Sequence, residues 1–237
     1  MTNPKQIIVV EGEADRQVIE CLCQVMAISP QIKVFPPKDL TLLELAELDS
    51  GVSQVKNSKT GVYNILASLL KRLEQGDIEN LAIIVDADQT GHNSGGFDET
   101  LKQIQQRLSP YQLTNTSNGL IFTHPQGGFP IGVWIMPNNQ DDGMIESWLA
   151  QCIHDNENSL FDKAKNNTPQ LAENPKFAEH HRIKAEVATW LAWQKKPSIG
   201  LYSAFVRDKR TYQPLLLNTQ SAAYQNLMSW LHSIFSS

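Results

Sequence analysis

Continuous apolar runs, each followed by an amphipathic segment, constrain the fold of this sequence more than any other feature. The runs at 7–10, 81–85 and 131–136 have no polar face, which is typical of strands buried on both sides. Apolar residues at helical spacing follow the first run at 18–26 and precede the second at 62–73. This alternation predicts an α/β fold whose mostly parallel sheet carries helices on both faces.

The remaining elements are predicted in the same way. Two more strands are expected at 32–35 and 120–122, and further helices at 40–48, 98–108, 144–153, 177–194, 200–207 and 222–235. Residues 155–174 are polar and rich in asparagine, which indicates a linker or an insertion with few apolar residues. We therefore expect an α/β core over 1–153, and over 154–237 a polar linker and a helical C-terminal cap packed on that core.

Length and composition narrow the class of protein. The 237 residues suffice for one large domain, or for a core with an appendage. No apolar stretch approaches the ~20 residues of a membrane span, and the three cysteines lack CxxC spacing, so we expect reduced thiols in the cytoplasm. Residues 1–150 carry 18 acids against 10 Lys and Arg, whereas residues 151–237 carry 7 against 10. The first part is suited to a cation and the second to an anionic partner.

Acidic residues follow two of the predicted strands. Glu11 ends the first strand, and Asp86 and Asp88 follow the strand at 81–85. Functional crevices of parallel α/β sheets lie at the carboxyl ends of the strands, so neighbouring strands would bring these acids together. Carboxylates without His or Cys favour Mg²⁺ or Mn²⁺ over Zn²⁺. Each acid alone is also typical of a turn or a helix cap.

The segments 10–15, with the letters VEGEAD, and 84–88, with the letters IVDAD, resemble the two signature motifs of the TOPRIM domain. The closest likeness is to the nuclease domain of OLD-family (overcoming lysogenization defect) proteins. The resemblance implies a TOPRIM-like fold, Mg²⁺ on the Asp86 and Asp88 pair, and Glu11 as acid/base or as ligand of a second ion. Asp15 matches the acid four positions after the glutamate in the OLD-type pattern, although an acid in a first helical turn also suits the helix dipole.

Three later residues complete the candidate site. Asp142 and Glu146 are spaced four apart at the start of the helix expected at 144–153, which would place both on one helical side. The OLD-type pattern resembles this in having a glycine and a glutamate after the last strand, which complete a two-metal site. Both acids are equally suited to capping and solvating a helix. Lys184 is the candidate cation, as in the late lysine of OLD-type nucleases, or else a surface lysine.

The resemblance implies a nuclease that hydrolyses phosphodiester bonds of DNA or RNA, in phage defence or nucleic-acid processing. Two metal ions would bind the attacking water and the leaving oxygen. Lys59 and Thr60 do not fit a P-loop, so any ATPase would be a partner on a separate chain.

Two other functions remain open. One is a phosphatase of the haloacid-dehalogenase type, with Asp86 as nucleophile, Thr123 at a strand end, and Asp141 and Asp142 as late metal ligands. The other is an inactive metal-binding module that recognises nucleic acid or a partner protein.

Overall fold

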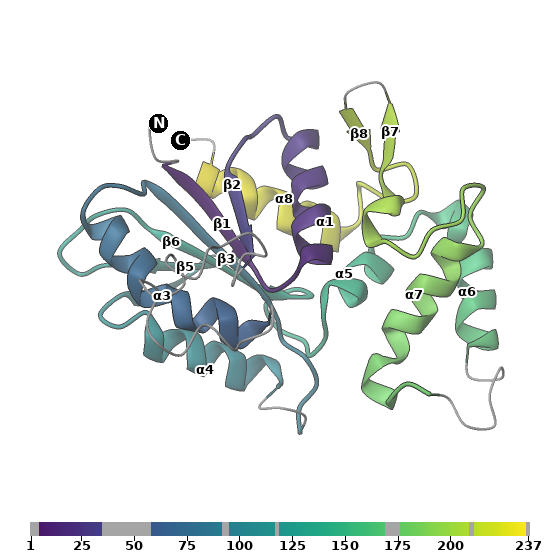
Figure 1. Ribbon diagram of the computed structural model, residues 1–237, viewed down its shortest axis with the longest axis horizontal. Coiled ribbons are helices and arrows are strands. Elements are labelled where there is room, and N and C mark those ends of the chain that lie inside the picture. Colours follow the sequence, from purple (N-terminus) through teal and green to yellow (C-terminus); the bar gives the residue numbers. More distant parts are fainter. Residues whose placement is uncertain are drawn as a thin grey trace, which may run out of the picture.

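A six-stranded sheet forms the centre of the protein in the computed structural model, which describes residues 5–34, 58–91, 95–116, 119–168, 176–208 and 211–235. The strands lie in the order β2-β1-β3-β6-β5-β4 (Figure 1). Their bounds are Gln6–Val10 for β1, Gln31–Val34 for β2, Asn80–Asp86 for β3, Gln112–Thr116 for β4, Gly119–Thr123 for β5 and Ile131–Met136 for β6.

The four strands β2, β1, β3 and β6 run parallel to one another, and β5 pairs antiparallel with both β6 and β4. The chain leaves β1 for β2 on one side and returns to β3 on the other side. The strand order therefore reverses between β1 and β3, which is where parallel α/β sheets place their functional crevice.

Helices cover both faces of the sheet, as the continuous apolar runs predict. Ile7 and Val9 of β1 face the core under α3 (Lys59–Glu74) and α4 (Phe97–Arg107). Ile8 and Val10 face the opposite core, which also contains residues of three helices, α1 (Glu13–Val25), α5 (Ile145–Gln151) and α8 (Ala222–Phe235). The predicted α/β class with a mostly parallel sheet is thus confirmed, and so is the C-terminal helix.

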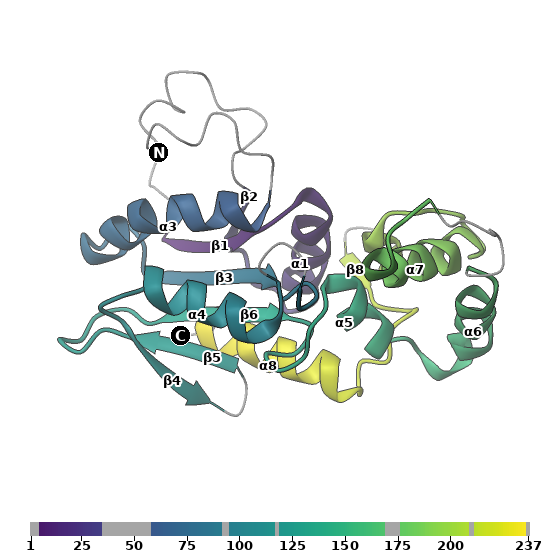
Figure 2. The same ribbon diagram turned by 90° about the horizontal axis from the view of Figure 1, so that it is seen from below.

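The last helix, α8, packs directly on the central sheet. α8 lies along β3, β6 and β5 (Figure 2). The Trp134 and Trp230 rings are 5.4 Å apart, and Gly132 leaves so little room that an added Cβ would lie 1.8 Å from Cδ1 of Ile234. A glycine in β6 therefore permits the close approach of α8.

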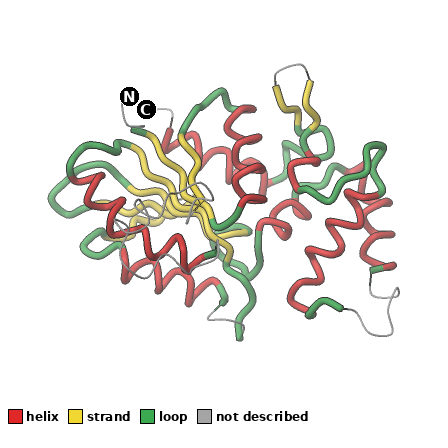
Figure 3. Tube along the Cα trace, viewed as in Figure 1, coloured by secondary structure: helices red, strands yellow, loops and turns green. Residues whose placement is uncertain are grey.

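Of the two alternatives for residues 155–174, the described residues form the insertion with few apolar residues. They contain α6 (Asn158–Asn167), which buries Phe161 and Ala164 against the core and packs on α7 (Arg182–Ala192). Two buried apolar side chains are enough to place this polar helix, and they are too few to be recognised by periodicity. Figure 3 shows α6 and α7 as adjacent helices.

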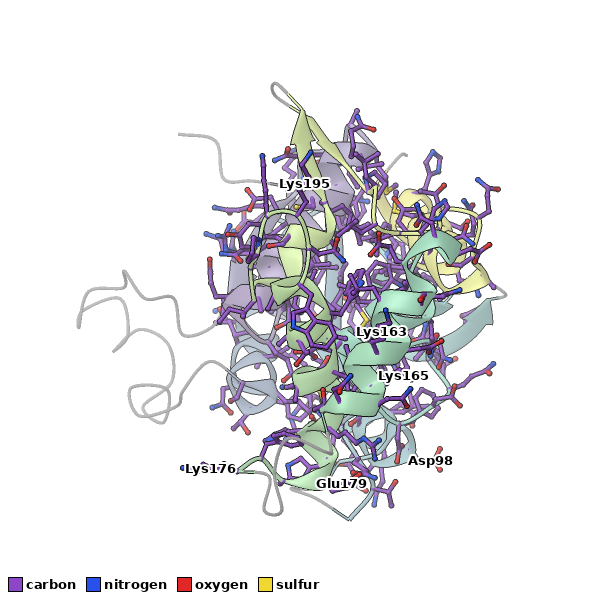
Figure 4. All side chains as sticks on the ribbon, turned by 90° about the vertical axis from the view of Figure 1, so that its right-hand side faces the viewer. Asp98, Lys163, Lys165, Lys176, Glu179 and Lys195 are labelled. Carbon is purple, nitrogen blue, oxygen red and sulfur yellow. The ribbon has the colours of Figure 1, made fainter. Side chains whose placement is uncertain are left out.

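Shorter elements complete this part. The helix expected at 177–194 begins only at Arg182, after a 3-10 turn, and the one expected at 200–207 is a 3-10 turn at Leu201–Ala204 followed by β7 (Val206–Asp208), which pairs with β8 (Thr211–Gln213). The helix expected at 40–48 lies outside the described residues. Figure 4 labels Lys163 and Lys165 on α6 and Lys195 beyond the C-terminal end of α7. Among the described residues, the helices are too short or too polar to cross a membrane.

Candidate functional site

Glu11 and Asp86 meet at the point where the strand order reverses. β1 and β3 are neighbours, with Val10 opposite Ile84, so the residue after β1 lies beside the end of β3. The backbone N–H of Asp86 donates to Oε1 of Glu11 at 2.8 Å, and this bond fixes the carboxyl group of Glu11 over the strand end. The structure thus brings together two acids that are 75 positions apart in the sequence.

Asp86 is the innermost acid of the site. Its side chain is 9% exposed, and its Oδ1 accepts the backbone N–H of Ile145 at 2.9 Å. Ile145 is the first residue of α5, whose first N–H groups have no partner within the helix. Asp86 therefore ties the start of α5 to the end of β3, and brings Glu146 toward the same edge.

Asp88 lies beyond the end of strand β3, and hydrogen bonds to the backbone of Gly143 hold it in place. Its φ of 62° is left-handed, and its N–H and C=O form a reciprocal bridge with Gly143, at 2.7 and 2.9 Å. Gly143 has a φ of 144°, and an added Cβ there would lie 2.7 Å from Oγ of Ser147. The bridge joins the loop after β3 to the loop before α5 and so fixes Asp88 relative to the start of α5.

Lys59 is a site residue that the sequence reasoning missed. Its Nζ donates to Oδ2 of Asp88 at 2.7 Å, to the carbonyl of Ala87 at 3.2 Å and to Oγ1 of Thr100 at 3.2 Å. Lys59 follows Ser58, the N-cap of α3, and α3 connects two parallel strands. The N-terminus of such a crossover helix lies at the carboxyl edge of the sheet. The position of Lys59 at the start of a crossover helix was therefore the signal that could have identified it, because the segment does not fit a P-loop.

Asp15, Glu146 and Lys184 form the other side of the acid cluster. Asp15, in the first turn of α1, interacts electrostatically with Glu146 and with Lys184 of α7. Lys184 is exposed, yet it faces both acids. Oε2 of Glu146 is buried and has no hydrogen-bond partner among the described residues. A buried carboxylate oxygen without a donor is costly, and this makes it the atom most in need of a proton or a cation.

Burial raises the pKa values of these acids. It raises the pKa of Glu11 to about 7 and that of Asp15 to about 6, and neighbouring carboxylates add to both shifts. Burial also places the pKa of Asp86 well above its usual range and raises that of Glu146. Asp15, Glu11 and Glu146 all act on Asp86, so the carboxyl groups repel one another across one small volume.

The donor set suits a hard divalent cation, but the side chains are not arranged as a finished set of ligands. Within the described ranges, no three His, Cys, Asp or Glu side chains converge on one metal position. In three of the acids, one carboxylate oxygen already accepts a hydrogen bond: that of Glu11 from the N–H of Asp86, that of Asp86 from the N–H of Ile145, and that of Asp88 from Lys59. The unpartnered oxygen of Glu146 and the mutual repulsion are the observations that favour a cation here.

Asp142 does not share a helical side with Glu146, so that expectation is wrong. α5 begins at Ile145, and Asp142 precedes it in a loop. Oδ2 of Asp142 accepts the backbone N–H and the hydroxyl of Thr90, at 2.9 and 2.6 Å, and Oδ1 accepts the N–H of Phe97 at 2.8 Å. These bonds, above all that from the Thr90 hydroxyl, lower the pKa of Asp142. The structure therefore uses both oxygens of Asp142 to hold the loop before α4.

We expect Asp142→Ala to lower the free energy of unfolding by about 1–2 kcal/mol, because N–H groups of Thr90 and Phe97 lose their acceptor at a helix start. Mn²⁺ affinity should change less than about threefold, or about 0.7 kcal/mol. Urea unfolding and a Mn²⁺ titration measure the two quantities. A loss of affinity of more than about tenfold, with little loss of stability, would show that Asp142 is a ligand.

Two hollows open on either side of Asp88. One, of about 340 Å³, lies between the 142–144 loop and the start of α7, with Arg182 and Glu186 among its lining residues. The other, of about 480 Å³, lies between α3 and α4 and is lined by Glu11, Lys59 and Arg107, among others. Asp88 lines both hollows, and Glu11 lines the second, so the acid cluster is reached from both.

The residues suggested for a phosphatase do not meet in the same way. β5 runs antiparallel to β6, so Thr123 lies near the edge where β3 begins, with Phe122 opposite Ile131 and Ile131 opposite Leu81. Asp86 ends β3 at the other edge of the sheet. Thr123 is therefore too far along the strands to act with Asp86.

Comparison with known proteins identifies a family for this chain. Residues 5–236 match the model of DUF3226, which is described as "Protein of unknown function". No curated protein and no solved structure matches the chain.

Proposed function

We infer that this chain, which belongs to the family DUF3226, is a Mg²⁺- or Mn²⁺-dependent nuclease of the TOPRIM type, similar to that of OLD-family proteins. The observation that carries the proposal is the meeting of Glu11, Asp15, Asp86, Asp88 and Glu146 at the reversal point of a parallel sheet. Their burial and mutual repulsion make the cluster unfavourable without added positive charge.

The site residues have different proposed roles in hydrolysis. Asp86, Asp88 and Glu146 are the proposed metal ligands, with Asp15 beside Glu146. A bound Mg²⁺ or Mn²⁺ would supply Lewis acidity and lower the pKa of a coordinated water. Glu11 has a pKa of about 7, and the N–H of Asp86 fixes its carboxyl group, so it can act as a general base at neutral pH.

Two lysines face the cluster from opposite sides. Lys59 contacts Asp88 from α3, and Lys184 acts on Asp15 and Glu146 from α7. A positive charge near the transferred phosphoryl group stabilises the charge that develops on its oxygens. Lys59 contacts Oδ2 of Asp88, so Asp88 would hold a metal ion through Oδ1, with the ammonium group of Lys59 beside it.

The substrate class follows from charge and shape. The two hollows beside Asp88 have Lys59, Arg107 and Arg182 among their lining residues. Cations in both hollows favour a DNA or RNA strand over a small phosphate ester. A cytoplasmic location agrees with three free, buried cysteines, and phage defence with a partner ATPase remains part of the proposal.

Cleavage assays test the function directly. The protein is incubated with labelled single- and double-stranded DNA and RNA, in Mg²⁺, in Mn²⁺ and in EDTA. The proposal predicts cleavage that needs the metal and is lost in Asp86→Asn. A rise in melting temperature with Mn²⁺ but no cleavage of any substrate would favour the inactive binding module, and a phosphorylated Asp86 in a mass spectrum would favour the phosphatase.

A further inference from the structure

A pocket with Lys59 and Arg107 among its lining residues adjoins the acid cluster on the side of α3 and α4. It has a volume of about 480 Å³, which is within the range of small-ligand sites. Its lining residues are Glu11, Ser58, Lys59, Thr60, Tyr63, Asp88, Gln103 and Arg107. Because Glu11 and Asp88 line it, a strand with a phosphodiester group at the acid cluster would reach this pocket with its next residue.

Arg107 is positioned at the pocket by neutral groups. Its guanidinium carbon lies 4.3 Å from the centre of the Tyr63 ring. Its NH1 donates to the carbonyl and to Oε1 of Gln103, at 2.9 and 2.6 Å. These contacts orient the guanidinium without neutralising its charge.

The other three cations near the site in the described part of the chain, Lys59, Lys184 and Arg182, already interact with carboxylates, Lys184 with those of Asp15 and Glu146. Lys59 donates to three oxygens, one of them the carboxylate of Asp88. Arg182, in the hollow on the other side of Asp88, is paired with Glu179 and Glu186. The positive charge of Arg107 is therefore the one best placed to meet a new anion.

We propose that this pocket binds the phosphate group of the nucleic-acid strand next to the bond that is cut, with Arg107 as the phosphate-binding residue. The inference rests on the proposed nuclease function and adds the path of the substrate to it. The guanidinium fork matches two phosphate oxygens, and Lys59 adds positive potential at the end of the pocket nearest to Asp88. The strand thus leaves the acid cluster toward α3 and α4 rather than toward α7.

The test measures binding and cleavage separately. Fluorescence anisotropy in EDTA gives the Kd of the protein for labelled single-stranded DNA and RNA oligonucleotides at several salt concentrations. Arg107→Ala should raise Kd about 5- to 10-fold and reduce the salt slope by about 1. Arg107→Lys keeps the charge and should recover part of the affinity. Lys102→Ala is the matched control on α4, because Lys102 is 63% exposed, pairs with Glu99 and does not line the pocket.

The outcomes test the pocket proposal and the nuclease proposal separately. If Arg107→Ala and Lys102→Ala have the same Kd and salt slope while the wild type cleaves, the pocket proposal is wrong and the nuclease stands. If Arg107→Ala alone weakens binding and no substrate is cut, the pocket proposal is supported and the nuclease is not. If the wild type binds neither oligonucleotide, the pocket proposal is wrong, and the cleavage assay alone decides the nuclease. Melting temperatures show whether each variant is folded.

Discussion

Glu11→Gln is expected to reduce the cleavage rate constant by about 10³-fold, within the range for loss of a general acid or base. Glutamine has nearly the same shape, and its carbonyl oxygen can still accept the N–H of Asp86. The amide cannot take a proton from water, nor does it carry the charge that a divalent cation favours. The fold should therefore remain intact while the chemistry is lost.

Glu13→Gln is the matched control for this prediction. Glu13 lies two residues further along the chain and is 38% exposed in an ion pair with Arg16, so it shares the segment but not the cluster. We expect its rate constant to stay within about threefold of the wild type, as for most surface ion pairs. Single-turnover rates at saturating Mn²⁺ measure both variants. If Glu11→Gln cleaves as fast as Glu13→Gln does, Glu11 has no chemical role.

Without metal, the free energy of unfolding should fall as the pH rises, and a divalent cation should raise it again. In the folded protein the pKa values of Glu11 and Asp15 are raised to about 7 and about 6, above those of the unfolded chain. Their contribution to the free energy of unfolding is fully present below the unfolded values near 4 and is lost as the pH rises through 6 and 7, since the folded state binds more protons. Each pKa unit corresponds to about 1.4 kcal/mol.

A divalent cation should reverse this loss, because it binds the deprotonated carboxylates. At about 100 times its Kd, Mn²⁺ adds about 2.7 kcal/mol to the free energy of unfolding. Thermal unfolding with Mn²⁺ and with EDTA should therefore show a larger metal effect at about pH 8 than at about pH 5. Asp86→Asn should reduce the metal effect. A metal-free protein that gains stability between about pH 5 and about pH 7 would contradict the placement of these acids.

The centre of the site could be predicted because it depends on strand order alone. Glu11 and Asp86 each follow a run that is apolar throughout, and the alternation of strands and helices makes those strands parallel. Parallel strands present their carboxyl ends at one edge, so two short sequence segments suffice to place these acids together. Lys184 is also brought near the cluster, since α7 packs against α5.

The rest depends on tertiary contacts that leave little trace in the sequence. The role of Asp142 follows from the register of α5, which starts at Ile145 because Met144 is extended and Gly143 is left-handed. Lys59 reaches Asp88 only through the packing of α3 on the sheet. Polar helix α6 has too few buried side chains for a clear periodicity, and edge strand β4 (Gln112–Thr116) has the letters QLTNT, which form no apolar run.

Anomalous scattering from crystals grown with Mn²⁺ tests the central claim most directly. The account predicts a manganese peak within about 2–2.5 Å of carboxylate oxygens from Asp86 and Asp88. Manganese bound only elsewhere at saturating concentration would contradict it.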